Sequence, residues 1–103
     1  MIDTIQFVNK LSERGYTHIC AVPCSFGKDF INAVINSSSI EYIPCASEAI
    51  AASTAVGLRI SGAFPIVFIQ SSGACNLGSC LTSLANPYSV FFPIICSWRT
   101  YKD

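Results

Sequence analysis

Charged residues are scarce in this chain. Six Lys and Arg balance six Asp and Glu among 103 residues, so 12% of the sequence is charged and the net charge is zero. Soluble domains usually carry about 25% charged residues. Proteins that bind phosphate backbones have a clustered basic excess, so we expect no nucleic-acid partner. The low charge also indicates that part of the surface is buried against another subunit or domain.

Long apolar runs and a secretory leader are also missing. A membrane-spanning helix needs about 20 consecutive apolar residues, whereas the apolar run from Ala63 to Ile69 has seven. A secretory leader places a basic start before an apolar block. Here Asp3, Lys10 and Glu13 alternate with the apolar positions near the N-terminus instead. We therefore expect a cytoplasmic chain that has no membrane partner.

Motifs for metal binding and nucleophilic catalysis are absent. The six cysteines never fall at the two-residue spacing typical of zinc and thioredoxin-like sites. The single histidine, His18, has no His or Cys at ligand spacing, so we expect a structural role for it and no metal ion held by this chain. Without a leader, the cysteines are interpreted as reduced, small apolar side chains. A Ser-His-Asp arrangement and a phosphate-binding glycine loop are also lacking.

The sequence does contain alternating helix and strand patterns. Helices are predicted over residues 5–11, 26–35, 48–60 and 75–84, and strands over residues 18–22, 40–43, 65–70 and 94–98. Each strand is a continuous apolar run, which is typical of a parallel sheet buried on both faces. The predicted fold class is therefore α/β, a parallel sheet with helices on both faces, in a single domain over residues 1–103.

Function is expected at one edge of this sheet, because ligands of parallel sheets bind beyond the carboxyl ends of the strands. Three segments follow predicted strand ends there, residues 23–25, 44–48 and 71–76. Glu48 is the acid at this edge, directly after Ser47, a predicted helix N-cap. A structural role also explains Glu48, because a carboxylate in the first turn of a helix is favourable. In the same way, Ser and Gly at 72 and 73 are explained by a turn.

Six motifs in order give a more specific indication. They are Val-Pro-Cys-Ser-Phe at 22–26, Lys-Asp-Phe-Ile-Asn at 28–32, Ala-Ser-Glu-Ala-Ile-Ala at 46–51, Gln-Ser-Ser-Gly-Ala-Cys-Asn at 70–76, Leu-Thr-Ser-Leu at 81–84 and Ser-Trp-Arg at 97–99. Together they resemble the pyrimidine-binding, N-terminal domain of the phosphonopyruvate decarboxylase and sulfopyruvate decarboxylase α-subunit family. The resemblance covers nearly the whole chain. Ser-Trp-Arg and Ala-Ser-Glu favour the phosphonopyruvate branch.

The resemblance implies a cofactor, a reaction and a set of site residues. The cofactor is thiamine diphosphate, and the reaction is decarboxylation of phosphonopyruvate, or of a sulfo analogue, a small 2-oxo acid. Glu48 matches the catalytic glutamate that hydrogen-bonds the aminopyrimidine of the cofactor and shares its proton. A substrate contact is implied for Ser25, and further cofactor contacts are implied for Pro23, Cys24, Ser72, Gly73 and Asn76. Magnesium is expected on a partner domain that this chain lacks.

The chain departs from the family pattern in two places. The family loop Asn-Ser-Gly-Leu-Gly-Asn has Ser71 in place of the first Asn and Cys75 in place of the second Gly. A side chain at 75 is unfavourable if that glycine needs a positive φ. Thr100 stands where the family has Gly, and the family domain continues with further strands and helices. We therefore expect a truncated domain, inactive alone, that works as a homo-oligomer or with a separate diphosphate-binding subunit.

Three functions remain compatible with these patterns. The first is a catalytic half-site that contributes Glu48 to thiamine diphosphate. The second is a non-catalytic remnant or interaction module with the same fold. The third and weakest is a redox or thiol-transfer protein based on Cys24, which lies on a predicted loop. The low charge favours the first two, because both imply a covered surface.

Overall fold

The computed structural model describes residues 3–23, 27–70 and 90–97. In chain order its elements are α1 (Thr4–Glu13), β1 (His18–Ala21), α2 (Lys28–Ile35), β2 (Glu41–Pro44), α3 (Glu48–Ile60), β3 (Pro65–Gln70) and β4 (Ile94–Ser97). The four strands form one sheet in the order β2-β1-β3-β4. All of their pairings are parallel. The predicted α/β class is confirmed.

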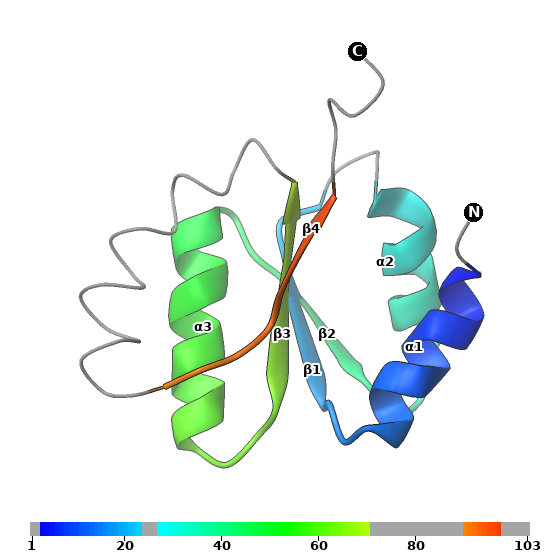
Figure 1. The fold of residues 1–103 in the computed structure, drawn as a ribbon. Coiled ribbons are helices and arrows are strands. Elements are labelled where there is room, and N and C mark those ends of the chain that lie inside the picture. The colour runs from blue at the N-terminus through cyan, green and yellow to red at the C-terminus, as the bar shows by residue number, and fades with distance from the viewer. Residues whose placement is uncertain (1–2, 24–26, 71–89, 98–103) are drawn as a thin grey trace.

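Helices cover both faces of the sheet, with α1 and α2 on one face and α3 on the other (Figure 1). The strand order explains this division. The crossover through α2 leads from β1 outward to β2, whereas the crossover through α3 leads back past β1 to β3. Right-handed crossovers that run in opposite directions must pass over opposite faces. The prediction of helices on both faces is therefore confirmed.

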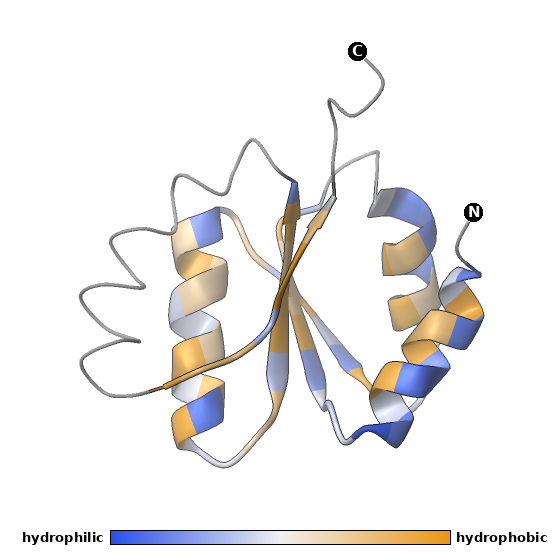
Figure 2. Cartoon of the chain, in the orientation of Figure 1, coloured by the Kyte–Doolittle hydropathy of each residue, from blue (hydrophilic) through white to orange (hydrophobic). Residues whose placement is uncertain are grey.

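The core consists of two apolar layers, one on each side of the sheet. Strand residues alternate between them, so that Ile66 and Phe68 of β3 face α1 and α2, while Val67 and Ile69 face α3. All of residues 65–69 are buried, which explains why this strand is a continuous apolar run. In Figure 2 the apolar colour is concentrated on the middle of the strands.

The predicted element boundaries agree with the structure to within one or two residues. β3 has the predicted bounds, while β1 ends one residue early, at Ala21, and β2 is shifted by one residue to Glu41–Pro44. α2 begins at Lys28 instead of residue 26, because Gly27 is its N-cap. β4 ends at Ser97, and the helix predicted over residues 75–84 lies outside the described residues.

Two glycines with a positive φ follow the ends of helices. Gly15, after α1, has φ +94°, and Gly62, after α3, has φ +101°. A glycine in this left-handed region is the common residue just past a helix C-terminus, because it lacks a Cβ.

Within the described ranges, no helix is long and apolar enough to cross a membrane. The cytoplasmic location stays a prediction.

Candidate functional site

The carboxyl ends of the strands meet at one edge of the sheet. In the strand register, Ala21 of β1 lies beside Pro44 of β2 and Phe68 of β3. Gln70, the last residue of β3, lies beside Ser97 of β4. The chain therefore leaves β1, β2 and β3 from the same edge, as the sequence predicts.

One point on this edge is favoured for ligand binding. In the strand order, β2 lies beside β1 in one direction, and β4 lies beside β3 in the opposite direction. The switch in direction lies between β1 and β3, and ligands of such sheets bind in the crevice at the carboxyl ends of these two strands. Pro23 follows β1 by one intervening residue, and Gln70 ends β3.

Glu48 lies at this edge as the first residue of α3. The N-cap before it, Ser47, is extended, with φ −151° and ψ 164°. The Ser47 hydroxyl oxygen accepts a hydrogen bond from the backbone N–H of Ile50 at 3.3 Å. The predicted cap is therefore confirmed. Glu48 is half-buried in the first turn, where the helix dipole favours a carboxylate.

The position of α3 is fixed by a close contact with the sheet. Ala51, Ala52 and Ala55 have no exposed surface and pack in one cluster with strand residues that include Val67 and Ile69. Alanine side chains are short, so the helix axis can approach the strands closely. The start of α3, and Glu48 with it, is therefore held against the edge by rigid packing.

Cys45 connects the end of β2 to this arrangement. Its backbone N–H donates to the carbonyl oxygen of Ala21 at 2.7 Å, and the residue is only 7% exposed. Burial raises the pKa of the Cys45 thiol. Burial, with a smaller contribution from neighbouring Cys45, raises the pKa of the Cys20 thiol to about 12. Both thiols are therefore protonated at neutral pH, consistent with cysteines that act as small apolar side chains.

The structure describes only some of the predicted site residues. Pro23, exposed after β1, and Glu48 lie at the same edge of the sheet. The other five predicted contacts lie outside the described residues: Cys24, Ser25, Ser72, Gly73 and Asn76. The same applies to the departures Ser71, Cys75 and Thr100. Their roles stay predictions.

Gln70 is a candidate that sequence reasoning did not assign to the site. It is half-buried at the carboxyl end of β3, next to the switch point. Ile66 and Phe68 face α1 and α2, so the alternation of β3 places Gln70 on that side of the sheet. The sequence feature that could have indicated Gln70 is a polar residue at the end of an otherwise apolar strand.

His18 lies at the opposite, amino edge of the sheet. Its Nδ1 is 2.7 Å from the hydroxyl oxygen of Thr17, and its Nε2 is 3.8 Å from a carboxylate oxygen of Glu41. The Thr17 hydroxyl oxygen also accepts a hydrogen bond from the backbone N–H of Phe64 at 3.0 Å. This network joins the amino ends of β1, β2 and β3 and fits the structural role predicted for His18.

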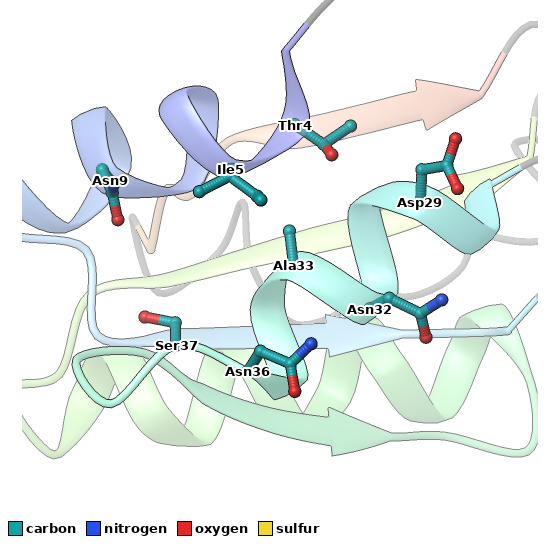
Figure 3. A pocket seen from close by; sticks show the side chains of 8 residues that line it. All are labelled: Thr4, Ile5, Asn9, Asp29, Asn32, Ala33, Asn36 and Ser37. Atoms are coloured by element: carbon teal, nitrogen blue, oxygen red, sulfur yellow. The ribbon is translucent and has the colours of Figure 1, made fainter.

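A hollow lies on the outer surface of α1 and α2 (Figure 3). Its volume is about 280 Å³, and it is lined by Thr4, Ile5, Asn9, Asp29, Asn32, Ala33, Asn36 and Ser37. It lies on the face of the sheet opposite α3, so it does not include Glu48.

The sequence of this chain is similar to those of known proteins. The family described as "Thiamine pyrophosphate enzyme, N-terminal TPP binding domain" matches residues 5–100. A phosphonopyruvate decarboxylase of Streptomyces viridochromogenes is 33% identical over 99 residues, which are 96% of this chain and 25% of that protein. A phosphonopyruvate decarboxylase of Streptomyces hygroscopicus is 32% identical over 99 residues, with the same shares. This chain therefore spans about a quarter of the length of these relatives.

Proposed function

Because the chain belongs to the thiamine pyrophosphate enzyme family as an N-terminal TPP-binding domain, we propose that it forms the aminopyrimidine half-site of a 2-oxo acid decarboxylase. The position of Glu48 carries this proposal. Its carboxylate stands at the first turn of α3, on the edge where the switch between β1 and β3 favours a ligand. A carboxyl group there can accept a hydrogen bond from a ring nitrogen when it is ionised and donate one when it is protonated.

In this proposal the Glu48 carboxylate exchanges a proton with the cofactor. One of its carboxylate oxygens hydrogen-bonds a ring nitrogen of the aminopyrimidine and shares a proton with it, which is general acid–base chemistry. Ser47 caps the helix, and the buried alanines hold it to the sheet, so the backbone that carries Glu48 is fixed at this edge. When thiamine diphosphate is bound, its thiazolium ring supplies the electron sink for decarboxylation.

The substrate proposed for the complete enzyme is phosphonopyruvate, which would give phosphonoacetaldehyde and CO2. Both Streptomyces relatives are phosphonopyruvate decarboxylases, and this supports the phosphono acid over the sulfo acid. Ser25 is the proposed substrate contact. The proposed cofactor contacts beside Glu48 are Pro23, Cys24, Ser72, Gly73 and Asn76.

The other half of the site is proposed to come from a separate domain or a separate subunit that binds the diphosphate. The edge segments 23–25, 44–48 and 71–76 contain no Lys or Arg to balance a diphosphate. We therefore assign the diphosphate, with its magnesium ion, to that partner. Cys75 in place of the family's loop glycine favours a second candidate, a non-catalytic interaction module of the same fold.

Calorimetric titration with thiamine diphosphate and magnesium tests the proposal. We expect weak binding by the isolated chain, and much tighter binding after addition of a diphosphate-binding chain from a phosphonopyruvate decarboxylase. Micromolar binding by the isolated chain would contradict the assignment of the diphosphate to a partner. Weak binding in the presence of a partner that forms a complex would support the interaction module instead.

A further inference from the structure

We draw no further inference here: the strongest candidate, the hollow of about 280 Å³ between α1 and α2 (Figure 3), is formed largely by exposed side chains on the outer surface of these helices, and nothing in the structure shows what would bind there.

Discussion

Replacing Ser47 by alanine tests whether its hydroxyl anchors the start of α3. The first N–H groups of a helix have no partner within the helix, and the Ser47 oxygen accepts the one from Ile50. Loss of an N-cap hydroxyl typically costs about 1 kcal/mol, within a range of about 0.5–2 kcal/mol. The observed distance of 3.3 Å is long for an N–H···O bond. We therefore expect a loss of about 0.5–1 kcal/mol for Ser47→Ala.

Thermal unfolding of the purified chain, followed by circular dichroism, measures this loss. For a domain of this size, 1 kcal/mol lowers Tm by about 4–8 °C, so we expect a decrease of about 2–8 °C. Ser61→Ala is the matched control at the other end of α3. Its hydroxyl donates to the carbonyl oxygen of Leu58 at 2.7 Å, but Ser61 is exposed and water can replace it. The reasoning is refuted if Ser47→Ala leaves Tm unchanged, or if both variants lower it equally.

Two further predictions concern the core and the surface. Because the pKa of the Cys20 thiol rises from 9.0 to about 12 on folding, the unfolded chain deprotonates first, and stability falls between pH 9 and 12. Urea titrations should give a smaller fall for Cys20→Ala, and equal falls would contradict this. Sedimentation should show self-association through exposed apolar side chains, and Ile50→Asp, which places a charge at a half-exposed apolar position of α3, should weaken it. A monomeric wild-type chain at high concentration would refute the association.

Much of the fold could be predicted because local patterns specify it. The run Pro65 to Gln70 gave the bounds of β3, since a strand buried on both faces must be apolar throughout. Ser47 gave the start of α3, since a hydroxyl is a strong N-cap signal. The predicted end residues of β1 and β2 were less accurate. They depend on hydrogen bonds to neighbouring strands, such as Cys45 N–H to Ala21, which no local pattern encodes.

The candidate site was only partly predictable. Glu48 is a candidate because the family resemblance assigns its position and the predicted helix start after Ser47 places it at the carboxyl edge of the sheet. Gln70 was missed, because its place beside the switch point depends on β3 pairing with β1 and not with β2. That pairing follows from the packing of α3 on the opposite face from α2, which is a property of the whole fold.

The proton-sharing role of Glu48 is tested most directly by exchange of the thiazolium C2 proton. The measurement uses Glu48→Gln in complex with a diphosphate-binding chain, in the presence of thiamine diphosphate and magnesium. The amide keeps the shape of the side chain and one hydrogen bond but removes the carboxylate. General acid–base catalysis contributes about 10²–10⁴-fold, so we expect exchange at least about a hundredfold slower than in the wild type.

Glu41→Gln is the matched control for this measurement. Glu41 is a carboxylate at the amino end of β2, with a side chain that is 72% exposed, and we expect normal exchange in this variant. A Glu48 that serves only the first turn of α3 predicts a different result. Its replacement would cost no more than about 1 kcal/mol of stability through the helix dipole. Slow exchange in Glu48→Gln alone supports the account, and normal exchange with slightly reduced stability would contradict it.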